Sequence, residues 1–167
     1  IDSVHVPDGE FVSRSKDEGE LLAALKSKFY DTVFVYGRRG SGKTSLIQHA
    51  LQGRRGVFEI KLFEKTDADA SSELIEKLST GVHIFHSPKD YIFVQDVFTA
   101  CWAWWVEPIV VVSLEKECNA EVLRAVLTFC KVLSYDRRKK TARFIVSLSA
   151  SRAAIDASIL LSKLRCV

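Results

Sequence analysis

One octapeptide constrains this chain more than any other feature. Residues 37–44 read Gly-Arg-Arg-Gly-Ser-Gly-Lys-Thr and fit the phosphate-loop pattern G-x-x-x-x-G-K-[ST] at every fixed position. A β-branched apolar run, Thr32 to Tyr36, precedes the loop, and a helical pattern follows it from Ser45. A glycine-rich turn before a helix is the alternative interpretation, but Gly-Lys-Thr in this context is a demanding match. Strand, glycine loop and helix in this order therefore predict a phosphate-binding α/β fold.

The loop residues have separate expected roles. Glycines let backbone N–H groups turn inward around a phosphate, and the helix N-terminus adds the positive end of its dipole. Lys43 is expected to reach the β- and γ-phosphates as a catalytic residue, and Thr44 to place its hydroxyl on Mg²⁺. The expected nucleotide-binding residues are Gly37, Arg38, Arg39, Gly40, Ser41, Gly42, Lys43, Thr44 and Ser45.

Adenine is the expected base, so ATP or ADP with Mg²⁺ are the expected ligands. Residues 64–67 read Glu-Lys-Thr-Asp and are weakly similar to a guanine-reading motif. They follow the second expected strand rather than a late one, and the asparagine of that motif is absent. We interpret them as a loop, which leaves adenine as the default.

Composition indicates one folded domain over residues 1–167. The hydrophobic fraction of 47% and the charged fraction of 27% are typical of globular proteins. No apolar run of about 18 residues is present, so we expect no membrane span. The chain contains no Met and starts without a basic and apolar leader, so we expect a fragment of a longer protein with no visible secretory signal.

The cysteines indicate a reducing compartment. They stand at 101, 118, 130 and 166, without C-x-x-C or zinc-ribbon spacing. Three of them lie in segments expected to be helix or strand cores, which favours buried thiols over disulfides. We therefore expect an intracellular protein, in cytoplasm or nucleus. His83 and His86 could bind a metal if helical, but the sequence places no third ligand.

Strand and helix signals alternate along the whole chain, which predicts a three-layer α/β sandwich, the architecture of a P-loop NTPase core. A mainly parallel central sheet would be flanked by helices on both faces, with the ligand at the carboxyl ends of the strands. The expected strands are 32–36, 57–62, 109–112 and 144–148, with the start of another at 164–167. The expected helices are 18–28, 43–52, 71–79, one that opens near 87 and includes 105, 119–133 and 152–163.

Two helices carry apolar stripes that predict which side chains are buried. Trp102 and Trp105 share the stripe of Phe98 and Cys101, so core packing is expected in preference to base stacking. Trp104 falls off this stripe, which predicts exposure or a partner surface. On the helix over 119–133 the expected buried stripe is Val122, Val126, Phe129, Val132 and Leu133.

Hydrolysis would need an acidic group near Mg²⁺, usually at the end of a second buried strand. The candidate strand over 109–112 is followed by Ser113, Leu114 and then Glu115. Ser113 could bind Mg²⁺ through water, and a loop shift could bring Glu115 inward as a catalytic group. The alternative is that Glu115 and Glu117 lie in a solvated loop.

A third constellation follows the strand over 144–148. A small polar residue there could hydrogen-bond the γ-phosphate or the attacking water. Ser149 is the first candidate and Ser147 the second. Arg152 could serve as an arginine finger, and the alternative is that it points to solvent.

Residues 11–21, the loop and residues 145–152 together resemble AAA+ and STAND ATPases, of the origin-recognition and archaeal-ATPase type. The opening, Phe-Val-Ser-Arg-Ser-Lys-Asp-Glu-Gly-Glu-Leu, is similar to the lead F-x-G-R-x-x-E-x-x-x-L of that family. Residues 145–152 are similar to its sensor 1 strand. The resemblance spans roughly residues 10–167 and implies an ATP-binding and ATP-hydrolysing switch module.

Three departures from the family pattern matter. Ser13 replaces the lead glycine, and Ser113 with Leu114 replaces the acidic pair. The chain also stops where the family's fifth strand begins, so the helical lid is missing. A nucleotide-binding scaffold with weak or no catalysis is therefore the competing interpretation.

Two further functions stay open from the sequence. A phosphotransferase shares the loop, but no acceptor pocket is identified. The run Arg137-Arg138-Lys139-Lys140 could contact nucleic acid, although a solvated loop is the default interpretation and the net charge is only +3. Self-association or a protein partner is compatible with a switch module.

Overall fold

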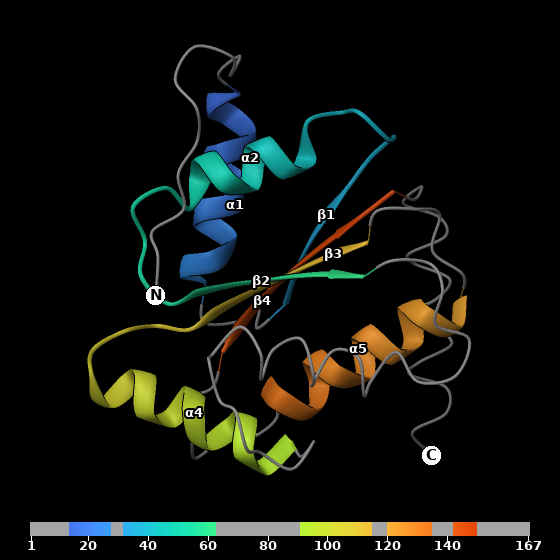
Figure 1. Cartoon of the computed structure of the whole chain (residues 1–167). Helices are drawn as coiled ribbons and strands as arrows, with labels where there is room; N and C mark the ends of the chain where they lie inside the picture. The colour runs from blue at the N-terminus through green and yellow to red at the C-terminus, as the bar shows by residue number, and fades with distance from the viewer. Residues whose placement is uncertain (1–13, 28–31, 63–90, 115–119, 135–141, 150–167) are drawn as a thin grey trace.

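A four-stranded parallel sheet forms the centre of the molecule (Figure 1). The computed structural model describes residues 14–27, 32–62, 91–114, 120–134 and 142–149. The strands are β1 (Thr32–Tyr36), β2 (Val57–Leu62), β3 (Ile109–Leu114) and β4 (Arg143–Leu148), and their order across the sheet is β1-β4-β3-β2. All three pairings are parallel, so the carboxyl ends of the strands gather at one edge.

Helices cover both faces of the sheet, which makes the expected three-layer α/β sandwich (Figure 1). On one face lie α1 (Ser15–Lys26) and α2 (Lys43–Ala50), which also contact each other. On the other lie α4 (Tyr91–Ala103) and α5 (Ala120–Ser134). The predicted fold class, an α/β sandwich with a parallel central sheet, is confirmed, and it is consistent with a P-loop NTPase core.

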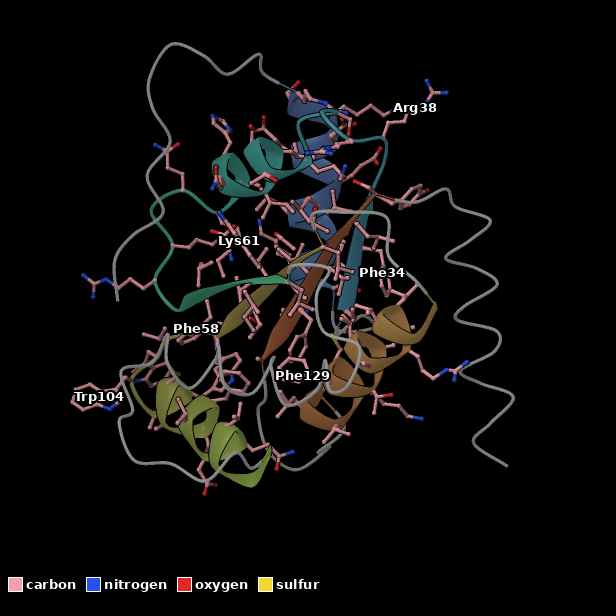
Figure 2. The ribbon with its side chains drawn as sticks, turned by 45° about the vertical axis from the view of Figure 1, so that its right-hand side comes forward. Phe34, Arg38, Phe58, Lys61, Trp104 and Phe129 are labelled. Atoms are coloured by element: carbon pink, nitrogen blue, oxygen red, sulfur yellow. The ribbon has the colours of Figure 1, made fainter. Side chains whose placement is uncertain are left out.

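The face under α4 and α5 is packed with apolar side chains along the whole length of the strands. Phe129 of α5 meets Phe144 of β4 edge to face at 6.0 Å, and Phe58 of β2 lies 6.1 Å from Phe98 of α4. Phe58 and Phe129 both point to this side of the sheet in Figure 2. We call this surface of the sheet the closed face.

The opposite face, which α1 and α2 cover, has a smaller core. Leu21 and Leu25 of α1 and Ile47 of α2 are buried there, against strand residues such as Val111 and Ile145. The period-2 alternation of the strands explains how one sheet supplies both cores. We call this surface the open face, because it contains the cavity described below.

Element bounds follow the expectations closely, with small shifts. The strands over 32–36 and 57–62 have the predicted bounds, whereas β3 extends two residues past the expected end, through Leu114. Helix α1 begins three residues before the expected start, and α2 ends at Ala50, two residues early. The expectations for 63–90, 115–119, 135–141 and 150–167 lie outside the described residues.

Two expectations of burial are wrong. Helix α4 ends at Ala103, so Trp105 lies in a turn with φ of 59° and is 96% exposed rather than packed on the stripe of Phe98. Trp104 is also exposed, as the periodicity indicates, and projects outward in Figure 2. On α5 the buried stripe runs through Val126, Phe129, Cys130 and Leu133 at helical spacing, which leaves Val132 at its exposed flank.

The described cysteines are free thiols, Cys101 half-buried and Cys130 buried. Cys118 and Cys166 lie outside the described residues. Among the helices that the structure describes, none has the length and apolar content needed to cross a membrane.

Candidate functional site

The phosphate loop leaves the carboxyl end of β1 and returns directly into α2. Gly40 and Gly42 have φ of 75° and 76°, a left-handed backbone that other L-residues rarely adopt. Ser41 N–H donates to the Arg38 carbonyl at 3.2 Å, and Gly42 precedes the first residue of α2. The glycines of the motif therefore form the tight turn that brings the α2 N-terminus to the end of the strand.

Lys43 lies over its own loop. Its Nζ donates to the carbonyls of Gly37 at 3.0 Å and Arg38 at 2.8 Å, and to Ser149 Oγ at 3.4 Å. Partial burial lowers the pKa of Lys43 from its usual value. With these three oxygen partners, the ammonium group lies over the turn that the sequence predicts to bind phosphate.

The structure brings Ser149 to the loop, although the two are far apart in the sequence. Ser149 directly follows β4, and β4 pairs with β1 so that Tyr36 is level with Leu148. The order of the strands therefore places the end of β4 beside the loop. This position is the one expected of the sensor 1 candidate, whose role stays a prediction.

Arg14 makes a contact to the loop that the sequence reasoning missed. Its Nη1 donates to the Ser41 carbonyl at 2.8 Å, and its Nη2 lies 2.6 Å from Asp17 Oδ2. Glu18 of α1 in turn contacts His49 of α2, with 3.0 Å between Oε2 and Nδ1. The only sequence signal for this link is the resemblance of residues 11–21 to the family lead, which contains Arg14.

The other predicted loop residues are at the surface. Arg38 and Arg39 are exposed, and Arg38 extends away from the loop in Figure 2. Thr44 and Ser45 occupy the first turn of α2 and are exposed. All nine residues predicted to bind the nucleotide thus lie together in one continuous turn and helix start.

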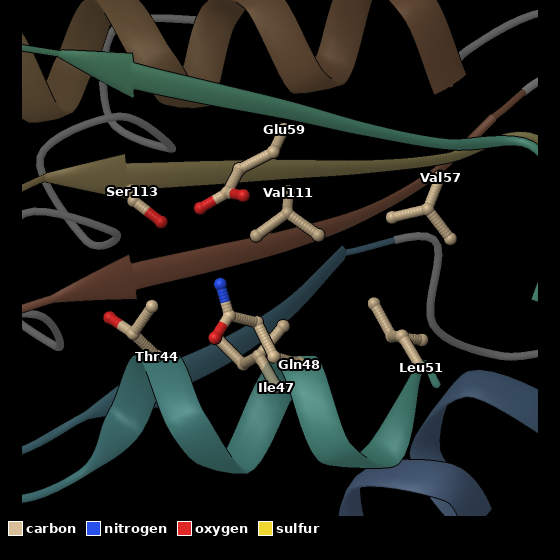
Figure 3. A pocket seen from close by; sticks show the side chains of 8 residues that line it. All are labelled: Thr44, Ile47, Gln48, Leu51, Val57, Glu59, Val111 and Ser113. Atoms are coloured by element: carbon tan, nitrogen blue, oxygen red, sulfur yellow. The ribbon is translucent and has the colours of Figure 1, made fainter. Parts of the chain in front are cut away.

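A cavity of about 190 Å³ lies between α2 and the strands β2 and β3 (Figure 3). Its lining combines apolar and polar side chains, and those labelled in Figure 3 converge on the space between helix and sheet. The lining residues are Thr44, Ile47, Gln48, Leu51, Val57, Glu59, Val111 and Ser113. The cavity adjoins the phosphate loop at Thr44, which belongs to both.

Two serines occupy neighbouring strands at the same level of the open face. Ser113 of β3 pairs with Ser147 of β4, and both are buried, with 7% and 4% of their surface exposed. The described part of β3 carries no carboxylate. Glu115 and Arg152, two of the four residues expected to be catalytic, lie outside the described residues, whereas Lys43 and Ser149 are brought together.

The donors around Thr44 fit a hard cation such as Mg²⁺. Magnesium prefers oxygen ligands and keeps several of its waters, with one or two carboxylates completing the site. The cavity supplies the hydroxyls of Thr44 and Ser113 and the carboxylate of Glu59. The described ranges contain no group of three or more His, Cys, Asp or Glu side chains that could hold a metal ion. Hydroxyls, water or phosphate would therefore have to supply the other ligands.

Two solved structures of the Aeropyrum pernix ORC2 protein have a similar fold, one with ADPNP-ADP complexes and one in the ADP form. Each aligns with 98% of this chain at a TM-score of 0.59 and 15% sequence identity. The chain spans 48% of the length of the first and 49% of the second, about half in each case. No protein-family model matches the chain, and no curated protein matches it. Identity this low shows a shared fold alone.

Proposed function

We propose that this chain is an ATP-binding switch module of the AAA+/STAND type, which binds Mg·ATP and hydrolyses it slowly. The observation that carries the proposal is the arrangement of Lys43, whose ammonium group lies across the glycine turn within reach of Ser149. Such a loop surrounds phosphate oxygens with backbone N–H groups and a positive helix end. The nucleotides in the two ORC2 structures support the same ligand class.

In this proposal each part of the site has a separate role. The loop from Gly37 to Ser45 binds the phosphates, and Lys43 stabilises charge on the β- and γ-phosphates. Thr44 and Ser113 hold the hydrated Mg²⁺, which neutralises phosphate charge when bound. Ser149 orients the γ-phosphate or the attacking water. Glu115, which follows β3 in the sequence, and Arg152, which follows β4, are the remaining catalytic residues in this proposal.

A nucleotide-binding scaffold without turnover is the second candidate. The observation in its favour is the uncharged end of β3, where Ser113 and Leu114 stand in place of an acidic pair. The two candidates share nucleotide binding and differ only in hydrolysis. A switch of the first kind resets itself, whereas the second depends on exchange of the bound nucleotide.

Nucleotide binding and ATP turnover with Mg²⁺, measured for wild type and Lys43→Ala, test the proposal. We expect the variant to lose about 100-fold or more in ATP affinity, since it removes the loop's charge-assisted hydrogen bonds. The matched control is Lys131→Ala, an exposed lysine of α5 on the far side of the sheet. Unchanged binding by Lys43→Ala would sink the proposal. Turnover in the wild type that Glu115→Gln abolishes would favour the ATPase, and binding without turnover would favour the scaffold.

A further inference from the structure

Glu59 is the one carboxylate among the side chains that line the cavity beside the loop. In Figure 3 its carboxylate lies between Val111 and Ser113, and the amide of Gln48 on α2 points toward it. Neither the loop contacts nor the pair of serines gives this side chain a role. A carboxylate close to bound phosphate would be stabilised by a cation between the two negative groups.

The sheet register explains why Glu59 reaches this place. Its pairing partner is Val111, one strand over, and the next residue pair on the same face is Lys61 with Ser113. Phe58, Ile60 and Leu62, which alternate with these residues, are buried in the closed-face core. The side chain of Glu59 therefore stands on the open face, one same-face pair before Ser113 and three residue pairs before the end of β3.

In the structure Glu59 forms a long, solvent-exposed ion pair with Lys61. Lys61 Nζ lies 3.8 Å from Glu59 Oε1, and the two side chains are 48% and 35% exposed. An ion pair this open to solvent contributes little, typically less than about 1 kcal/mol. A divalent cation in the cavity would compete with it effectively for the carboxylate.

We propose that Glu59, from β2, supplies the carboxylate that holds Mg²⁺ and its waters beside Thr44, a place that β3 leaves without an acidic residue. The inference rests on the proposed nucleotide site and adds one residue to it. The metal would then lie among the Thr44 hydroxyl, the Ser113 hydroxyl and the Glu59 carboxylate, with nucleotide phosphates and water as the remaining ligands.

The test measures affinity for ADP and ATP by calorimetry on the full chain, once with Mg²⁺ and once with EDTA. We expect Mg²⁺ to tighten binding to the wild type, and Glu59→Gln to lose about 10-fold or more of that gain. Binding in EDTA should stay within about twofold, because the loop itself is untouched. Glu20→Gln, which removes an exposed carboxylate from α1, is the matched control and should keep the whole gain.

A direct readout of the metal accompanies the affinities. Electron paramagnetic resonance of Mn²⁺ with ADP should show bound metal in the wild type and in Glu20→Gln, and mostly free metal in Glu59→Gln. Retention of bound Mn²⁺ or of the full Mg²⁺ gain by Glu59→Gln would overturn the inference. Loss of binding in EDTA would also overturn it, since Glu59 would then act on the fold or the nucleotide.

Failure of the proposed function would look different. A wild-type chain that binds no nucleotide in either buffer would refute the nucleotide site and the inference together. A wild-type chain that binds equally well with Mg²⁺ and with EDTA would overturn only the metal role of Glu59.

Discussion

The two faces of the sheet differ in the side chains that they carry at the carboxyl ends of the strands. On the closed face each inner strand stays apolar to its last residue, with Leu114 and Leu148 buried under the helices. On the open face the same strands turn polar at the preceding residue, Ser113 and Ser147. On the edge strand β2, Lys61 occupies the matching position.

This difference separates stability from chemistry within a single sheet. Successive side chains of a strand point to opposite faces, so one residue can complete a core while its neighbour supplies an oxygen atom to a site. The closed face holds the largest buried side chains, whereas packing on the open face stops at the cavity. Substitutions on the closed face should therefore mainly lower the free energy of unfolding, whereas those at the cavity on the open face should mainly lower ligand affinity.

Truncation on the closed face should have the largest effect on folding. Phe129 is fully buried and contacts Phe144 edge to face. We expect Phe129→Ala to lower the free energy of unfolding by about 3–5 kcal/mol in urea titrations. Val132→Ala, a truncation on the exposed flank of the same helix, should cost less than about 1 kcal/mol. Equal losses for the two variants would contradict the assignment of the main core to this face.

The closed face should also make stability fall at alkaline pH. Burial raises the pKa of Cys130 from 9.0 to about 12. Above pH 9 the unfolded state loses the thiol proton while the folded state keeps it, so this contribution is complete below pH 9 and decreases toward pH 12. The slope should be at most about 1.4 kcal/mol per pH unit.

Urea titrations across this range check the role of Cys130. Cys130→Ala should be less sensitive to pH than the wild type, because it removes the titrating group. Cys101→Ala should change the slope less, since Cys101 is only half-buried. Identical slopes for wild type and Cys130→Ala would show that other groups cause the alkaline loss.

A smaller effect is expected at the amino end of the strands, the end of the open face that lies away from the phosphate loop. Arg143 Nε donates to Glu107 Oε1 and its Nη1 to the Ser27 carbonyl, each at 2.6 Å. Arg143→Lys keeps the charge but cannot reproduce both bonds, so we expect a loss of about 1–2 kcal/mol in thermal or urea unfolding. Nucleotide affinity should not change, and exposed Arg55→Lys should change neither property. A fall in affinity with unchanged stability would show that this end belongs to the binding site.

Local patterns in the sequence predicted the fold and the loop, because both depend on neighbouring residues. The octapeptide contains its own turn, and the alternation of Val57 to Leu62 gives β2 with the correct bounds. Trp105 was predicted wrongly because the period of a helix does not say where the helix ends. The sequence also showed that no acidic residue occupies 109–114, although the strand was expected to end before Ser113.

Contacts between distant segments could not be predicted from the sequence in this way. Glu59 reaches the cavity because of the register between β2 and β3, and Ser149 reaches Lys43 because β4 lies beside β1. Neither register nor strand order can be inferred from local periodicity. The roles of Glu115 and Arg152 stay predictions.

The strand order also sets when the site can form during synthesis of the chain. The phosphate loop is made early, but the strand that pairs with β1 is the last of the four, so Thr32 must wait for Phe144. Pairings between such distant segments are slow steps in folding, because the chain loses loop entropy before they form. A ribosome-bound chain that has not yet exposed β4 would therefore carry the complete loop sequence without the support that orients it.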